Sequence, residues 1–85
     1  ASVFPSITAV LAALPLEVLG RLENASAQTL DSVELKLKSG QTVFWGSADA
    51  NEAKARVLEA LLKMEPSDPP VQVYDVSTPD RPVTR

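Results

Sequence analysis

The 85-residue chain contains no cysteine and no histidine. Without cysteine it has neither a disulfide framework nor a thiol nucleophile. Without histidine it lacks the commonest general base and the commonest metal ligand. The sequence therefore argues against an enzyme, and we expect no catalytic residues, no metal site and no cofactor.

Positive charge is also scarce. Eight lysines and arginines face eleven acidic residues, which gives a net charge of −3 and a pI near 4.7. Nucleic acids and anionic membranes are bound by clustered Lys and Arg, so we expect neither as a partner. The longest apolar run, residues 7–14, is far below the ~20 residues that cross a bilayer, and no basic segment precedes it as in a signal peptide. Any membrane anchor is therefore expected outside this chain.

The length suits one small domain with a modest core. The chain is 45% hydrophobic and 22% charged, which is typical of a folded domain rather than a disordered segment. It begins with Ala1 instead of methionine. We therefore expect it to be a piece of a longer protein.

The N-terminal third predicts a helix and then a less regular segment. Four apolar residues recur at helical spacing: Ile7, Val10, Leu11 and Leu14. Ser6 is placed to cap this helix and Pro15 to end it. From Leu16 onward the pattern predicts a short turn and then a strand near residues 21–25.

Residues 32–38 alternate apolar and charged side chains, which predicts a half-buried strand, and residues 41–46 predict a second strand. A two-residue loop at Ser39-Gly40 would place Lys36 opposite Val43. A three-residue loop over residues 38–40 instead pairs Leu35 with Val43 and Val33 with Trp45, so that the apolar side chains share one face. We predict the three-residue loop, with Gly40 in the left-handed conformation.

A second helix is predicted to start near Asp49, because residues 49–52 have the form of a capping box. Its expected apolar stripe consists of Ala53, Val57, Leu58, Leu61 and Met64. Glu52 with Arg56 and Glu59 with Lys63 are expected to form ion pairs one helical turn apart. Pro66 is expected to end the helix, and residues 66–70 to form a stiff connector.

Residues 71–77 predict the last strand, and the two prolines in residues 78–85 exclude a central strand there. The predicted fold is α+β: a mostly antiparallel sheet with two helices on one face, in the order α-β-β-β-α-β.

The hairpin of residues 32–46 resembles that of the FtsQ/DivIB cell-division family, in which a Gly turn joins two strands and a helix with an early Lys follows. Lys54 stands at that position. The family closes with a strand of the form Asp-apolar-x-x-Pro, which residues 75–79 fit. Trp45-Gly46 and the run Tyr74-Asp75-Val76-Ser77 are most similar to actinobacterial members.

The resemblance implies that residues 1–85 are the C-terminal portion of an extracytoplasmic β domain. Family members are single-pass membrane proteins of the division septum, with a cytoplasmic tail, a membrane helix and a POTRA domain that this chain would lack. They are non-catalytic divisome scaffolds that bind FtsB and FtsL and support septum formation.

The resemblance also implies that a partner strand pairs beside the last strand, so residues 74–78 are the expected free edge of the sheet. The partner contacts that follow are Tyr74, Val76, Ser77, Thr78 and Val83. Better-known members often carry Arg at the position of Ser77 and an aromatic residue at that of Thr78. A charge-assisted hydrogen bond to a partner carboxylate is therefore lost here.

Several features have a simpler reading. Trp45 is expected in the core rather than as an interface anchor. Phe44 is expected on the outer face, either under a strand from elsewhere or against a partner. Asp75 is interpreted as a turn residue and Asp80 as solvated, because no base or nucleophile accompanies them. The tail from Arg81 to Arg85 is expected to be loose.

The alternative function is a self-associating structural module of an unrelated α+β type that uses the same edge to dimerise. Open sheet edges in a partial domain also favour dimerisation or strand exchange between copies.

Overall fold

The computed structural model describes residues 4–64 and 70–85. Its elements are α1 (Phe4–Ala13), α2 (Leu16–Arg21), β1 (Leu22–Ala27), β2 (Val33–Leu37), β3 (Thr42–Gly46), α3 (Asn51–Lys63), β4 (Val73–Asp75) and β5 (Val83–Thr84). The strands form one sheet in the order β1-β2-β3-β4-β5, antiparallel except between β3 and β4. The predicted α+β class with a mostly antiparallel sheet is confirmed.

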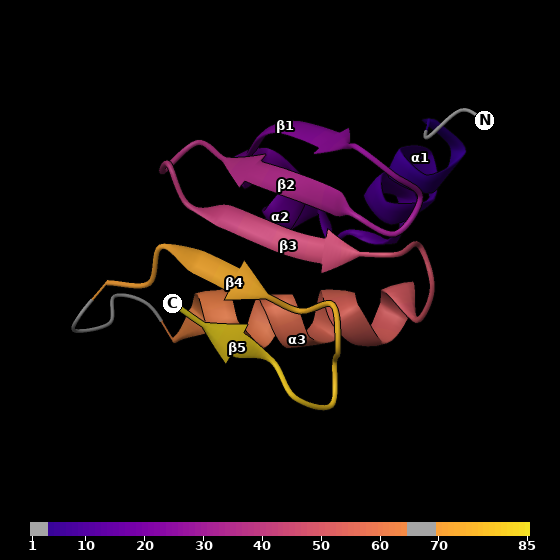
Figure 1. Ribbon diagram of the computed structural model, residues 1–85. Helices are drawn as coiled ribbons and strands as arrows, with labels where there is room; N and C mark the ends of the chain where they lie inside the picture. Colours follow the sequence, from indigo (N-terminus) through magenta and orange to yellow (C-terminus); the bar gives the residue numbers. More distant parts are fainter. Residues whose placement is uncertain (1–3, 65–69) are drawn as a thin grey trace.

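The three helices cover one face of the sheet and leave the other open (Figure 1). Strand β2 explains why, since its apolar side chains alternate with exposed Glu34 and Lys36. The apolar residues of the buried core are Val10, Leu14, Val18, Val33, Leu35, Leu37, Val43, Trp45, Ala55, Leu58, Leu62, Tyr74 and Val76. Every helix and strand except β1 and β5 contributes a core residue, so the two edge strands are the elements that add none.

The N-terminal segment differs from its prediction. Helix α1 already begins at Phe4, so Ser6 lies inside the first turn and is not the cap. Helix α2 replaces the predicted turn, and the strand runs from Leu22 to Ala27 instead of over residues 21–25. Helix α2 is too short to be stable alone, and it is stabilised by packing of its buried Val18 side chain into the core.

The hairpin prediction is confirmed at its turn. Gly40 has a φ of +93°, its N–H donates to the Leu37 carbonyl at 2.9 Å, and Leu35 lies opposite Val43. The pairing of Val33 with Trp45 was wrong: Val33 lies opposite Gly46, because the register shifts between Val33 and Glu34. The shift places two residues of β3 opposite one of β2, and the Trp45 side chain still reaches the core, as predicted.

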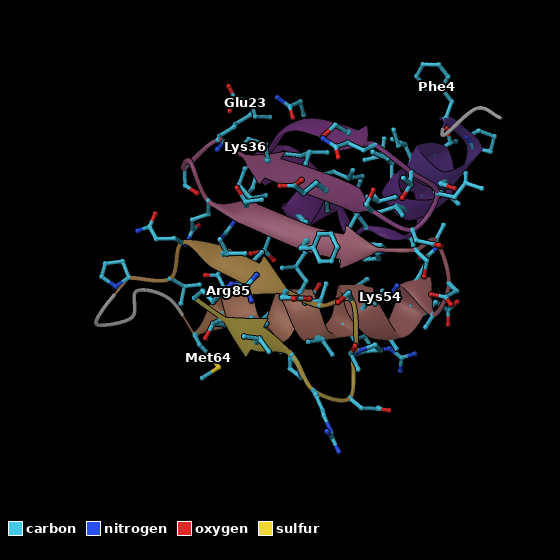
Figure 2. The ribbon with its side chains drawn as sticks, viewed as in Figure 1. Phe4, Glu23, Lys36, Lys54, Met64 and Arg85 are labelled. Carbon is cyan, nitrogen blue, oxygen red and sulfur yellow. The ribbon has the colours of Figure 1, made fainter. Side chains whose placement is uncertain are left out.

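Helix α3 starts without the predicted capping box. Ala50 occupies the N-cap in the left-handed conformation, and no side chain caps the helix. The buried side is centred on Leu58 with Ala55 and Leu62, whereas Met64 is 72% exposed and projects from the helix end (Figure 2). The two ion pairs are confirmed. The predicted helix end at Pro66 and residues 66–69 of the predicted connector lie outside the described residues.

The C-terminal segment departs most from its prediction. Only Val73 to Asp75 form β4, which pairs in parallel with β3. The expected free edge at residues 74–78 was wrong, because Val83 and Thr84 return as β5 and pair with β4 on its other side. The tail is therefore an edge strand and not a loose end.

Candidate protein-binding edge

Residues 74–77 anchor the C-terminal segment to the rest of the domain. Tyr74 and Val76 are 1% and 0% exposed. The Gln41 side-chain amide donates to the Tyr74 hydroxyl at 3.3 Å and to the Val71 carbonyl at 2.7 Å. Two buried anchors therefore bracket Asp75 and hold its backbone in register with β3.

Asp75 ends β4 through its own side chain. Its Oδ1 accepts the Ser77 N–H at 3.1 Å and the Ser77 hydroxyl at 2.6 Å, which forms an Asx turn. Ser77 then passes close to Gly46 at the end of β3. The chain leaves the sheet at this point, which confirms the interpretation of Asp75 as a turn residue.

A second turn brings the tail back. The Arg81 N–H donates to the Thr78 carbonyl at 2.9 Å, with Pro79 in the second position of the turn, where its fixed φ is favourable. Val83 then lies opposite Asp75 and Thr84 opposite Tyr74. Pro79 thus lies in the turn that reverses the chain before β5. Because β5 is an edge strand, the prediction that no central strand forms in residues 78–85 is confirmed.

The backbone of β4 is used on both sides. Toward β3, the Gln72 carbonyl accepts the Thr42 N–H and the Val76 N–H donates to the Phe44 carbonyl, both at 3.0 Å. Toward the tail, Val73 exchanges two hydrogen bonds of 2.9 Å with Arg85. By the alternation of a strand, the backbone groups of residues 73 and 75 face the tail and those of residues 74 and 76 face β3. Gln72, which precedes β4, points its carbonyl toward β3 and its N–H toward Arg85.

The open face continues across this edge. The registers place Glu34, Phe44, Asp75 and Val83 in one row across β2 to β5. Phe44 is half-buried in the middle of that row, and the Arg85 guanidinium lies 3.8 Å from the Asp75 carboxylate. The edge thus combines an aromatic ring, an aliphatic side chain and one ion pair.

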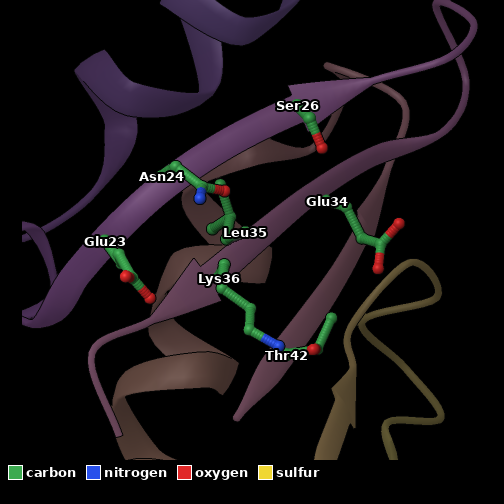
Figure 3. A pocket seen from close by; sticks show the side chains of 7 residues that line it. All are labelled: Glu23, Asn24, Ser26, Glu34, Leu35, Lys36 and Thr42. Carbon is green, nitrogen blue, oxygen red and sulfur yellow. The ribbon is translucent and has the colours of Figure 1, made fainter. Parts of the chain in front are cut away.

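A hollow of about 270 Å³ lies farther along the open face, over β1 to β3 (Figure 3). Its lining is polar except for one residue and consists of Glu23, Asn24, Ser26, Glu34, Leu35, Lys36 and Thr42. Within residues 4–64 and 70–85, no group of three or more His, Cys, Asp or Glu could hold a metal ion. In the same ranges no helix has the length and apolarity needed to cross a membrane.

Lys54 fixes the loop that connects β3 to α3. The residue is 1% exposed, and its ammonium donates to the Ser47 carbonyl at 2.8 Å and to Asp49 Oδ1 at 3.1 Å. Hydrogen bonding from the Ser47 hydroxyl, followed by the Lys54 contact, holds the pKa of the Asp49 carboxyl below its ordinary value. Asp49 therefore serves the loop and not the helix cap. The sequence signal for this was a lysine on an otherwise apolar helix side.

The residues predicted to contact a partner do not have equal access. Tyr74 and Val76 are buried, Ser77 is half-buried, and only Thr78 and Val83 are exposed. The side chains of Tyr74 and Val76 are therefore covered, and their backbone groups point toward β3 by strand alternation. Sequence reasoning missed Val73, which offers backbone groups at the edge, and Arg85, which pairs with Asp75.

Comparison with known proteins identifies the family. No family model and no solved structure matches the chain. Three curated relatives are all described as cell division protein FtsQ. The protein of Mycobacterium leprae is 41% identical over 76 residues, that of Streptomyces venezuelae is 42% identical over 71, and that of Mycobacterium tuberculosis is 40% identical over 76. These matches cover 89%, 84% and 89% of the chain.

The chain belongs to the FtsQ family. The resemblance noted from residues 32–46 and 74–79 is thereby confirmed, including its actinobacterial character, and the unrelated α+β module is set aside. The chain spans about a quarter of the length of the relatives it matches, with 21%, 25% and 23% of the three proteins covered. Within this FtsQ segment, the turn motif after β4 has the physical roles described above.

Proposed function

We propose that the chain is the partner-binding part of a non-catalytic cell-division scaffold. In this proposal it forms the C-terminal portion of the extracytoplasmic β domain of a single-pass membrane protein at the division septum. Its partners are FtsB and FtsL, and at least one of them adds a β-strand at the β4–β5 end of the sheet. The curated relatives, each described as a cell division protein, support the cellular role.

The observation that carries the binding mode is the build of the last edge. Strand β5 is two residues long and stands at the end of the strand order, and Val83 is 45% exposed. A row of backbone groups at a sheet edge pairs readily with an added strand, and alternate side chains then give specificity. Here Phe44, Asp75 and Val83 supply those side chains on the open face.

The opposite edge, β1, is the natural comparison. Ser26 in β1 and Thr78 after β4 are both exposed and lie at opposite ends of the sheet. The chain has no cysteine, so a single cysteine at either site can carry a benzophenone cross-linker. We expect Thr78→Cys to cross-link to the extracytoplasmic segment of FtsB and Ser26→Cys not to. Cross-linking from Ser26→Cys alone would contradict the proposed edge.

Self-association through the same edge is the second candidate, because both ends of the sheet are open strands. Sedimentation at several concentrations separates the two functions. A dimer that the FtsB segment dissociates supports partner binding. A dimer that persists in excess FtsB segment supports self-association as the function of this edge.

A further inference from the structure

The edge of β4 at which a partner strand would pair is already occupied by β5 of the same chain. The opposite edge of β4 pairs with β3, so β4 has no further edge for a partner. Val73 exchanges hydrogen bonds with Arg85, and the Gln72 N–H adds a third to the Arg85 carbonyl at 2.7 Å. Asp75 lies in register with Val83 as the next pair. A strand has two edges only, so the tail and a partner strand cannot pair with β4 together.

The tail is held by little besides these backbone bonds. All residues from Asp80 to Arg85 are exposed, and no core residue lies beyond Val76. The Arg85 side chain is 58% exposed, so its contact with Asp75 is screened by solvent and contributes little. Segments with few buried apolar contacts open locally at low free energy. The tail is therefore attached weakly enough for exchange.

We infer that β5 occupies the position of the partner strand, and that the partner binds by displacing residues 82–85 and pairing directly with β4. This inference rests on the proposed function and adds its regulation: the tail is an intramolecular competitor. Binding then proceeds only from the fraction of molecules in which β5 is detached.

The side chains of the tail also indicate which residues a displacing partner strand would carry. Val83 places an aliphatic side chain opposite Asp75 on the open face, and Arg85 places a cation two residues later, 3.8 Å from the same carboxylate. A partner segment that takes this position runs antiparallel to β4. It carries an aliphatic residue, any residue, and then a basic residue. The aliphatic side chain lies in the row of Phe44, and the basic side chain reaches Asp75.

The size of the competition is set by the closed fraction of the tail. An apparent dissociation constant equals the intrinsic constant divided by the competent fraction, so a tail closed about nine-tenths of the time weakens binding about tenfold. Hydrogen exchange at the Val73 N–H reports that fraction in the free chain, because this group is bonded to the tail and not to β3. The exchange measurement thus predicts the binding change independently.

The test compares the full chain with a chain that ends at Asp80, using the extracytoplasmic FtsB segment as the probe and Trp45 fluorescence to verify that both are folded. We expect the shortened chain to bind more tightly by the factor that Val73 exchange gives. Equal or weaker binding by the folded shortened chain would overturn the competitor role and leave the proposed function standing. Binding by neither chain would overturn the proposed function and the competitor role with it.

A variant that keeps residues 1–85 gives a second test without shortening the chain. Val73→Cys with Arg85→Cys places two cysteines at a hydrogen-bonded antiparallel pair, whose usual Cα separation of about 5.5 Å suits a disulfide. We expect the oxidised form to lose binding to the FtsB segment and the reduced form of the same variant to regain it. Equal binding by the two forms would show that the partner does not need the position of β5.

Discussion

A Cβ atom on Gly46 would lie 2.9 Å from the Cβ of Ser77 and 3.5 Å from its Cα. This contact joins the end of β3 to the point where the chain leaves β4. Gly46 also has a φ of +85°, which side chains other than glycine rarely adopt. The close approach of Ser77 and the positive φ each require glycine at position 46. Both features lie where the chain leaves β4 toward the tail.

The three glycines of the chain form a graded test of that contact. Gly40 has a positive φ but open space around it, and Gly20 in α2 has open space and no positive φ. We expect Gly46→Ala to lower the free energy of unfolding by about 2–4 kcal/mol, from left-handed strain and overpacking together. Gly40→Ala should cost about 1 kcal/mol, and Gly20→Ala should gain up to about 1 kcal/mol. Urea unfolding followed by Trp45 fluorescence measures all three, and equal losses at Gly46 and Gly40 would contradict the close contact.

Asp75 should act mainly through its hydrogen bonds to Ser77 and not through its charge. Asp75→Ala removes the acceptor of both Ser77 bonds and should destabilise the domain by about 1–2 kcal/mol. Asp75→Asn keeps an oxygen acceptor and loses only the exposed ion pair, so its loss should stay near 0–1 kcal/mol. Asp80→Ala is the control, because Asp80 is exposed. Equal losses in the Ala and Asn variants would show that charge dominates.

Lys54 should matter far more than a surface lysine on the same helix. Lys54→Met keeps an aliphatic stem in the buried position but leaves the Ser47 carbonyl without its 2.8 Å donor, so we expect a loss of about 1–3 kcal/mol. Lys63→Met removes only an exposed pair with Glu59 and should cost less than about 0.5 kcal/mol. Thermal unfolding of the two variants measures the difference. Equal melting temperatures would contradict a larger contribution of Lys54.

Asp49 should contribute an acid-sensitive part of the stability. Its pKa in the folded chain lies below the ordinary value of 3.8, chiefly through the Ser47 hydroxyl and then Lys54. The contribution is therefore present above about pH 4 and is lost as the pH falls through the lower pKa of the folded state. The stability difference between the parent chain and Asp49→Asn should shrink as the pH falls below about 4. A difference that grows in acid would contradict this direction.

The hairpin and its neighbourhood were predictable because local and global preferences agree there. The alternation of residues 33–37 indicated which side of β2 is buried, and the match of apolar faces across the hairpin indicated the loop length, with Gly40 left-handed. The register error at Trp45 arose because a bulge at a strand end changes the pairing without changing which face the side chain takes. Helix α2 was missed because six residues give a weak periodic signal.

The remaining errors depend on contacts that form only in the folded chain. Asp49 occupies a position typical of a helix cap, but its carboxylate instead accepts a hydrogen bond from the buried Lys54 ammonium. Pro79 and Pro82 are strand breakers by local rules, yet Pro79 sits in a turn that returns the tail to β4. Only the folded sheet shows that an unoccupied edge exists for Val83 and Thr84 to pair with. The partner contacts predicted at Tyr74, Val76, Ser77, Thr78 and Val83 assumed that β4 was the free edge, and they stay a prediction.

Strand addition at the β4–β5 end of the sheet is tested most directly by titrating the isotope-labelled chain with the extracytoplasmic segment of FtsB from the same organism. Backbone NMR then maps the binding residue by residue. We predict saturable shifts concentrated on residues 72–85, with new cross-strand contacts to the amides of Val73 and Asp75. Shifts confined to β1, or no shifts from a folded chain, would contradict a partner site at this edge.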